Sequence, residues 1–322
     1  GAAGVAMLIG LAVFRTRSGP TLGPIGRDPS GTPAQQARVR TITLGIAAVI
    51  ALLIILGVAG VVQFNPVAIA SNMTAVMLTM SALYFLYLFF GAGLSGPEKK
   101  RVVVIVVLFL FSMIFWAAFE QSPTSLNLFA RDFTDRQLGG WEMPASWFQS
   151  IEPFFVVALA PLMAALWIGL EKRGMALSSP TKFSFALATA GIGFIAMVVA
   201  ANAVLASGGT LKVSPLWLVF CYFTHAVGEL ALSPVGLSSM TTLAPRRLLG
   251  QMMGVWYTSI ALGNLFAGIV GGEVDPSKLE QAPALFSRTA ISLFVAAVIL
   301  LLLVIPIRRM MAGNNRTSGL AD

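Results

Sequence analysis

The sequence contains little charge, one cysteine and one histidine. Only 11% of its 322 residues are charged, whereas about 25% are charged in an average soluble domain. Hydrophobic residues make up 57% of the chain, and the mean hydropathy is +0.84. Cys221 alone cannot form an internal disulfide, and with His225 it cannot supply the ligands of a dedicated zinc site. The composition predicts a polytopic membrane protein without a bound metal.

The signatures of enzymes and of nucleic-acid-binding proteins are also missing. The sequence has no nucleophile elbow, no phosphate-binding loop and no Ser/His/Asp order, so we expect no enzymatic activity and no cofactor. The net charge of +8 comes from basic residues scattered singly and in pairs between apolar runs. Because no basic stripe exists, nucleic acid is not an expected partner, whereas the lipid bilayer is.

Long apolar runs predict eight full transmembrane helices, preceded by the end of another helix. Residues 1–14 are apolar but have no start, so we interpret them as the end of a truncated helix. Basic residues are concentrated in alternate loops, which places those loops and the C-terminus in the cytoplasm by the positive-inside rule. The predicted fold class is an all-α, multi-pass protein of the inner or plasma membrane. The full spans are expected at residues 41–64, 67–93, 102–128, 147–170, 183–206, 217–245, 252–270 and 285–307.

The sixth of these spans carries a carboxylate near its centre. Glu229 lies roughly 20 to 25 Å from either end of the run at about 1.5 Å per residue, close to the bilayer midplane. An ionisable group at that depth costs roughly 2.5 to 3.5 kcal/mol on insertion scales, so it is expected to face a wet cavity or a partner. Pro234, five residues later, allows the helix to bend. A charged, hinged helix at the centre of the membrane favours a transport function.

Two more carboxylates lie within spans. Glu120 is also expected near the midplane, with Pro123 shortly after it, and Glu152 closer to the start of its helix. Low-dielectric surroundings favour the protonated form of a carboxyl, and a nearby substrate ammonium favours the charged form, so such a group can couple proton movement to substrate binding. The alternative is a structural polar contact between helices. The Glu120–Pro123 and Glu229–Pro234 pairs are a weak internal repeat, of the kind expected from three-helix repeats in transporters.

Aromatic and polar residues surround these acids in the sequence. Trp116 lies one helical turn before Glu120, and aromatic faces can hold a cation, so Trp116 and Trp256 are candidate pocket residues, with packing as the alternative. Ser233 and Asn264 are candidate hydrogen-bonding residues, with helix packing as the alternative. His225, one turn before Glu229, is interpreted as a packed residue rather than a proton relay.

Four motifs carry a resemblance to a known family. They are FWAAFEQ at residues 115–121, GELALSPVGLS at 228–238, GQMMGVW at 250–256 and ALGN at 261–264. Together and in this order they resemble the proton-coupled oligopeptide transporter (POT) family of the major facilitator superfamily. Bacterial members of that family have twelve core helices and two extra helices between the halves. The resemblance implies that the chain is the C-terminal six-helix half with the two inserted helices.

The resemblance also implies domain boundaries. Residues 15–40 are then a cytoplasmic linker, 41–93 the inserted helix pair, 94–101 a cytoplasmic loop, 102–309 the six-helix transporter half and 310–322 a cytoplasmic tail. The N-terminal half, with its substrate and proton residues, is expected as the missing partner. On its own the chain is not expected to transport.

Roles for individual residues follow from the motifs that they match. Glu120 matches the protonatable acid beside the substrate, and Glu229 matches the acid that meets the amino terminus of the peptide. Trp116 and Trp256 match aromatic pocket or gate positions, and Ser233 matches the serine beside the second acid. Glu152 departs from the pattern, because the family has an Asn-Pro where this sequence has Glu152-Pro153. Relative to the family pattern, position 152 therefore has no side-chain amide and adds a second titratable carboxyl.

The sequence therefore predicts the C-terminal half of a symporter that brings di- and tripeptides into the cell with protons as the coupling ion. Two alternatives stay open. One is a related proton-coupled carrier for nitrate or organic anions, although both acids that suit a peptide amine are present. The other is a membrane receptor or scaffold that binds peptides without transporting them, for which carboxylates in a cavity are unnecessary.

Overall fold

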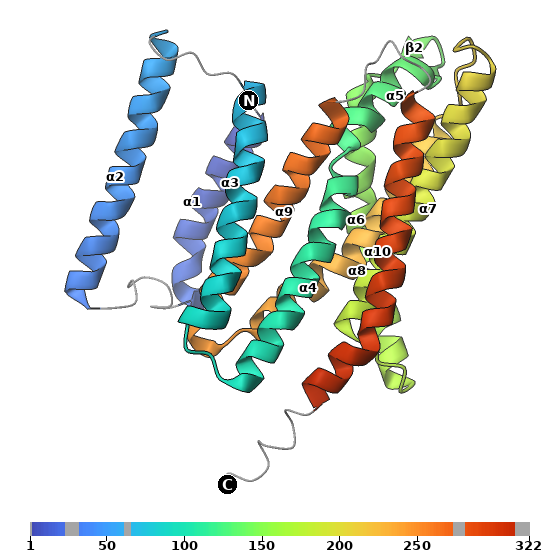
Figure 1. Ribbon diagram of the computed structural model, residues 1–322. Coiled ribbons are helices and arrows are strands. Elements are labelled where there is room, and N and C mark those ends of the chain that lie inside the picture. The colour runs from blue at the N-terminus through green and yellow to red at the C-terminus, as the bar shows by residue number, and fades with distance from the viewer. Residues whose placement is uncertain (1, 23–31, 61–65, 273–280, 313–322) are drawn as a thin grey trace. The chain divides into compact units, whose positions relative to one another are not determined.

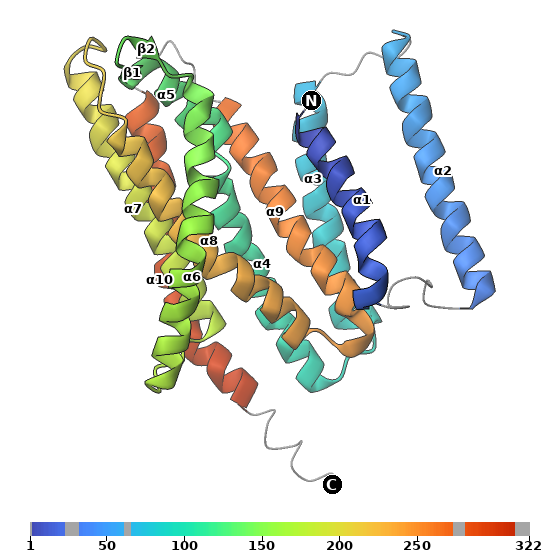
Figure 2. The ribbon, with the colours of Figure 1, turned by 180° about the vertical axis from the view of Figure 1, so that it is seen from behind.

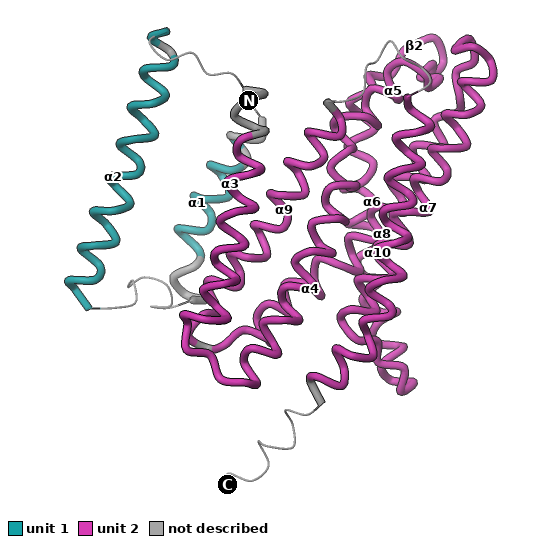
Figure 3. The backbone as a smooth tube through the Cα atoms, in the orientation of Figure 1, with its two compact units in different colours: residues 1–66 teal, residues 67–322 magenta. Residues whose placement is uncertain are grey.

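The computed structural model describes residues 2–22, 32–60, 66–272 and 281–312. These residues are almost entirely α-helical (Figure 1). The chain divides into two compact units, Gly1–Pro66 and Val67–Asp322, which are described separately (Figure 3). The helices and strands are α1 (Ala2–Leu22), α2 (Pro33–Val58), α3 (Pro66–Leu86), α4 (Gly96–Phe119), α5 (Asn127–Phe133), β1 (Gln137–Leu138), β2 (Trp141–Glu142), α6 (Ile151–Lys172), α7 (Ser179–Ala206), α8 (Leu216–Leu243), α9 (Leu249–Gly272) and α10 (Gln281–Ala312).

The first unit contributes α1 and α2. Helix α2 begins earlier than its apolar run, because Thr32 and Gln35 form a capping box in front of it. The Gln35 backbone N–H donates to the Thr32 hydroxyl (3.4 Å), and the Thr32 N–H donates to the Gln35 side chain (2.9 Å). Pro33 occupies the first turn, where a missing N–H costs nothing. Polar capping residues outside an apolar run therefore lengthen the helix beyond the predicted span.

In the second unit, helix α4 ends shortly before Pro123. Ser95 and Glu98 cap its N-terminus, and the helix ends at Phe119, with Glu120 as the C-terminal capping residue. A π-helical turn over Ser122–Leu126 follows and leads into α5. Pro123 lies in this turn and has no N–H to continue the regular helical ladder. The break leaves Glu120 at a helix end rather than inside a continuous helix.

The polar segment after α5 forms a short antiparallel hairpin. Gln137 pairs with Glu142 and Leu138 pairs with Trp141. Gly139 and Gly140 both have positive φ angles, 57° and 89°, as a two-residue hairpin turn of the primed type requires. Arg136 forms an ion pair with Glu142. The hairpin connects α5 to a 3₁₀ turn (Ala145–Ser150) that leads into α6.

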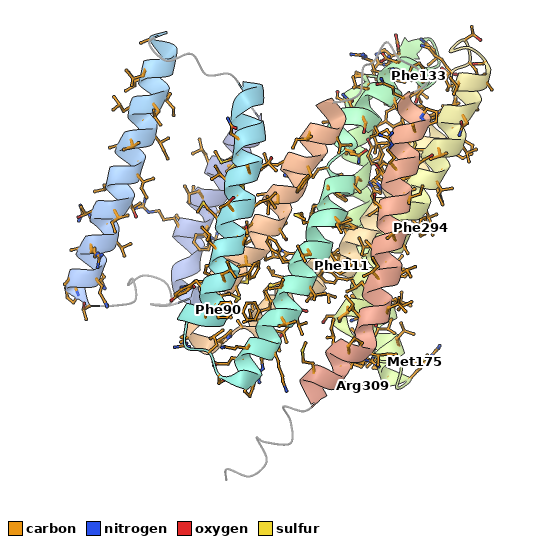
Figure 4. The ribbon with its side chains drawn as sticks, in the orientation of Figure 1. Phe90, Phe111, Phe133, Met175, Phe294 and Arg309 are labelled. Atoms are coloured by element: carbon orange, nitrogen blue, oxygen red, sulfur yellow. The ribbon has the colours of Figure 1, made fainter. Side chains whose placement is uncertain are left out.

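The long helices of the second unit pack as a bundle (Figures 1 and 2). Helix α7 packs most extensively against α10 and α8, α4 packs against α9, and α6 packs against α8. Small residues allow the close approaches: Gly191 of α7 faces Phe294 of α10, which Figure 4 labels, and Gly193 faces Thr224 of α8. The largest fully buried side chains are aromatic: Tyr222, Phe115, Phe148, Phe183, Phe194 and Phe286.

Eight helical segments of the described chain are long and apolar enough to cross a membrane. They correspond to the eight predicted spans, so the all-α, polytopic fold class is confirmed. The observed helices are longer than several of the predicted apolar runs. Helix α10, for example, extends from Gln281 to Ala312, whereas the apolar run covers 285–307. The predicted domain boundaries stay a prediction.

Two glycines of α9 provide a test of the contact between α4 and α9. A Cβ atom on Gly263 would collide with Trp116 and lie 3.0 Å from the backbone nitrogen of Ala117, whereas a Cβ on Gly268 would have no neighbour within 4 Å. We expect Gly263→Ala to destabilise the protein by about 1–3 kcal/mol through overpacking. Gly268→Ala is the matched control and should be neutral or stabilise by up to about 1 kcal/mol through helix propensity. Thermal unfolding of the detergent-purified protein measures both, and equal melting temperatures would contradict the described packing.

Candidate functional site

Three helices place the three carboxylates predicted from the sequence. Glu120 caps the C-terminal end of α4, Glu152 lies in the first turn of α6, and Glu229 lies in the middle of α8. All three residues are partly buried. Helix α8 packs against both α4 and α6, so it joins the three positions. Figure 2 shows α6 and α8 side by side on the near face of the bundle.

Aromatic contacts hold α4 and α8 together beside the acids. The ring of Phe119 stacks on His225, with 5.8 Å between the centroids and 29° between the planes. Phe119 precedes Glu120, and His225 lies one turn before Glu229. Gly228 allows the approach, because a Cβ there would lie only 3.1 Å from the ring of Phe115. As a result, the Glu120 and Glu229 carboxyls are close enough to interact electrostatically.

A second aromatic contact joins α6 to α8. The rings of Phe155 and Phe223 meet edge to face, 5.4 Å apart. On this side of the bundle the carboxyls of Glu152 and Glu229 lie within hydrogen-bonding range of each other. An ionised carboxylate only accepts hydrogen bonds, so a hydrogen bond between the two forms only when one of them holds a proton. Two carboxylates this close repel each other when both are ionised, and one proton between them relieves that repulsion.

Glu152 also interacts electrostatically with Glu120, so the three carboxyls form one group. They come from positions far apart in the sequence and meet because α8 lies between α4 and α6. We call Glu120, Glu152 and Glu229 the acid cluster. The structure thus brings together the three acids that the sequence analysis singled out, and it gives Glu152 a direct partner that the sequence did not reveal.

Tyr222 is a neighbour of the acid cluster that the sequence analysis missed. Its side chain is fully buried and lies close enough to Glu152 for an electrostatic interaction. The Ser122 hydroxyl, in the π-helical turn after Glu120, donates a hydrogen bond to the Tyr222 hydroxyl (3.3 Å). Tyr222 lies seven residues before Glu229, which is two helical turns on the same face of α8. This spacing of seven residues is the signal by which Tyr222 could have been found from the sequence.

Trp116 lies beside the acid cluster in an aromatic group. It is 7% exposed, and its ring meets Phe115 and Phe119 at 5.7 and 5.0 Å, both close to edge-to-face. Its indole nitrogen is buried and has no hydrogen-bond partner among the described residues. A tryptophan N–H is a hydrogen-bond donor only, so Trp116 retains an unused donor one turn from Glu120.

Trp256 occupies a different environment. It is 3% exposed and packs against Gly236 of α8 and Phe183 of α7, whose ring centroid is 6.2 Å away. These contacts give Trp256 a packing role between helices. A role in binding a substrate stays a prediction for this residue.

The other predicted polar residues differ in their surroundings. The Ser233 hydroxyl, one turn after Glu229, is buried and has no hydrogen-bond partner among the described residues. Asn264 lies on an exposed part of α9. His225 is 1% exposed and its ring also packs against Phe194 at 5.1 Å, which agrees with its interpretation as a packed residue.

A buried polar contact between α4 and α9 was also missed from the sequence. The Ser259 hydroxyl donates to the Ser112 hydroxyl (3.0 Å), and both side chains are fully buried. Ser112 lies one turn before Trp116, so this bond fixes α9 against the part of α4 that carries the aromatic group. Isolated serines within apolar runs give too weak a signal to be paired from sequence.

The described residues include no group of three or more His, Cys, Asp or Glu side chains arranged to hold a metal ion. The acid cluster has a different chemistry. It contains a carboxyl pair within hydrogen-bonding range and a third carboxyl within electrostatic range. Such a cluster can attract an organic cation and can take up or release protons.

Comparison with known proteins identifies relatives over nearly the whole chain. The chain is 44% identical to the peptide transporter YePEPT of Yersinia enterocolitica, covering 99% of this chain and 63% of that protein. It is 29% identical to dipeptide and tripeptide permease A of Escherichia coli, covering 80% of this chain and 53% of the permease. The chain therefore spans less than two thirds of the length of these relatives.

Solved structures agree with these relatives. A crystal structure of a peptide transporter POT in complex with sulfate superimposes with a TM-score of 0.80 at 33% identity, covering 96% of this chain and 61% of that one. A POT structure in complex with alafosfalin gives a TM-score of 0.79 at 33% identity and the same coverage. The profile described as PTR2, the POT family, matches residues 1–279. This chain belongs to the POT family of membrane transporters.

Proposed function

We propose that this chain is the part of a proton-coupled symporter that carries di- and tripeptides across the membrane. The observation that carries the proposal is the acid cluster, in which Glu120, Glu152 and Glu229 meet from three helices long enough to span a membrane. A peptide carries an ammonium at its amino terminus, which suits a carboxylate, and a symporter needs a protonatable group beside it. Relatives named as peptide transporters and as dipeptide and tripeptide permeases support this choice.

In the proposed mechanism Glu229 meets the peptide ammonium. Before binding, Glu152 and Glu229 share one proton. When the ammonium pairs with Glu229, the shared proton stays on Glu152, so the pair exchanges a hydrogen bond between carboxyls for an ion pair with the substrate. The Ser233 hydroxyl, one turn after Glu229, and the Trp116 indole N–H, one turn before Glu120, have no hydrogen-bond partner among the described residues, and both suit the polar backbone of a peptide.

Glu120 carries the coupling proton in this proposal. Protonation of Glu120 removes one negative charge beside Glu229 and leaves the ammonium as the counter-ion of Glu229. Loss of that proton after the helices rearrange restores the charge and changes the affinity for the peptide. The protein binds substrate and proton in one conformation and releases them in another, as alternating access requires. Protons are the coupling ion, and no other cofactor takes part.

The remaining length of the relatives supplies the partner of this bundle in the proposal. A peptide has a carboxylate as well as an ammonium, and basic residues in the other half of the transporter are proposed to bind it. The basic loops of this chain support an orientation with the C-terminus in the cytoplasm and the protein in the inner or plasma membrane. Transport is therefore a property of the full-length protein.

The coupling role is tested by Glu120→Gln in full-length protein reconstituted into vesicles. Glutamine mimics the protonated acid and cannot release a proton, so we expect peptide uptake driven by a pH gradient to be lost. Exchange of labelled for unlabelled peptide needs no net proton movement and should be retained. The exposed Glu171→Gln, at the end of α6, is the control. Gradient-driven uptake at the wild-type rate in Glu120→Gln would refute the role.

The carboxyl of Glu152 is expected to make the transporter favour cationic peptides, because a second substrate cation displaces the proton that Glu152 otherwise keeps and leaves that carboxyl ionised. A substrate cation about 8 Å from an ionised carboxylate, at an effective dielectric constant of about 20, gains about 2 kcal/mol, which is about thirtyfold in affinity. We therefore expect Glu152→Gln to reduce the preference for Lys-Ala over Ala-Ala by about that factor, with the affinity for Ala-Ala little changed. Glu229→Ala should weaken binding of both peptides, because both carry the terminal ammonium.

Competition for uptake of a labelled dipeptide measures these preferences. An unchanged ratio of Lys-Ala to Ala-Ala affinity in Glu152→Gln would contradict the role of Glu152. Wild-type affinity for both peptides in Glu229→Ala would contradict the binding of the amino terminus at Glu229.

A further inference from the structure

A second potential binding site lies away from the acid cluster, in a groove of about 350 Å³ between α4, α9 and α10. Met113 and Ala117 line it on α4, Phe266 and Val270 on α9, and Leu285 on α10. Met113 and Ala117 are one turn apart and share a face of α4, whereas Trp116 and Glu120 share another face. The groove therefore does not belong to the acid cluster.

One cation lies in this largely apolar groove. Arg288 of α10 lines it together with Gln121, Thr289 and Ser292. The other polar groups have partners in the protein: the Gln121 amide donates to the Thr289 hydroxyl (3.1 Å), and the Ser292 hydroxyl donates to the Arg288 carbonyl (2.8 Å). Among the described residues no carboxylate forms an ion pair with Arg288, and none lines the groove. Within the part of the chain that the structure describes, the guanidinium is thus the unmatched charge of the site.

The position of Arg288 along α10 corresponds to the level of lipid headgroups. Helix α10 has 32 residues, or about 48 Å, whereas the hydrocarbon core of a bilayer is about 30 Å thick, so about 9 Å extends beyond the core at each end of a centred helix. Arg288 lies seven residues after Gln281, which is about 10 Å from the helix start. The guanidinium is then at the boundary between headgroups and acyl chains.

An apolar stripe continues from Arg288 along the same face of α10. Val295, Ile299 and Leu302 follow at the spacing of helical turns and are 51%, 46% and 70% exposed. From Arg288 to Ile299 the helix rises by about 16 Å, close to half the thickness of the hydrocarbon core. The groove and the stripe thus form an apolar path about one leaflet long, with the Arg288 guanidinium at one end of it.

We propose that this groove binds an anionic phospholipid of the bilayer, with its phosphate on Arg288 and an acyl chain along the groove and the apolar stripe. A guanidinium presents a planar fork of N–H donors that fits two phosphate oxygens, and the pair removes the cost of an unmatched charge at the membrane boundary. The apolar lining from three helices accepts the chain. The site is independent of the proposed transport function, because no residue of the acid cluster takes part.

The test uses full-length protein in detergent and native mass spectrometry with added lipids. Phosphatidylglycerol and phosphatidylcholine with identical acyl chains are titrated separately. Both lipids carry a phosphate, but the choline ammonium of phosphatidylcholine offsets its charge beside the guanidinium, so phosphatidylglycerol is expected to bind the wild type about tenfold or more tightly. Arg288→Gln should reduce binding of phosphatidylglycerol to the level of phosphatidylcholine. Arg309→Gln, at the opposite end of α10 (Figure 4), is the matched control and should retain the preference.

Two further variants distinguish binding of the lipid headgroup from binding of the acyl chain. They also show whether a loss of binding is due to misfolding. Arg288→Lys keeps the charge but loses the planar fork, so its preference should be intermediate. Ser292→Phe places a ring over the groove while Arg288 is intact, and it should weaken both lipids. Equal binding of the two lipids by the wild type, full preference in Arg288→Gln, or an equal loss in Arg309→Gln would each overturn the proposal. Glycerol phosphate without acyl chains should not compete, and competition by it would overturn the role of the groove.

Discussion

The close approach of the Glu152 and Glu229 carboxyls is the contact on which the rest of the site depends. It brings two acids together inside a bundle of apolar helices, where a hydrogen bond between them forms only while one of them holds a proton. Removing a charged carboxylate from water without a partner is costly, so the shared proton makes the pair compatible with its position. It also leaves the pair ready to exchange that proton for a cation.

The packing of α8 explains how the acids come together. Gly228 has no side chain to hold α7 or α4 away, and the stacked rings of Phe119 and His225 set the contact with α4. On the other side the rings of Phe155 and Phe223 set the contact with α6. Helix α4 ends at Phe119, and a π-helical turn follows it. Glu120 therefore lies at a helix end and not inside a continuous helix. Aromatic packing therefore positions the charged groups.

Much of this arrangement could be predicted from the sequence, because apolar runs make an isolated charge conspicuous. Glu120 and Glu229 stand out in that way. The contact between Glu152 and Glu229 could not be predicted, since it depends on the rotation and tilt of two helices that are distant in sequence. The same reason hides the Ser112–Ser259 bond and the neighbourhood of Tyr222. Arg288 escaped attention because it lies near the end of its span, where a charge is unremarkable until the groove beside it is known.

The central claim is that the three acids behave as one group. Infrared spectroscopy of the full-length protein without substrate tests this, because a protonated carboxyl absorbs at a different frequency from an ionised one. The account predicts that Glu152→Gln changes the carboxyl absorption that remains from Glu229 and shifts that of Glu120. If each substitution removes only its own absorption and leaves the others as in the wild type, the acids are independent and the account is wrong.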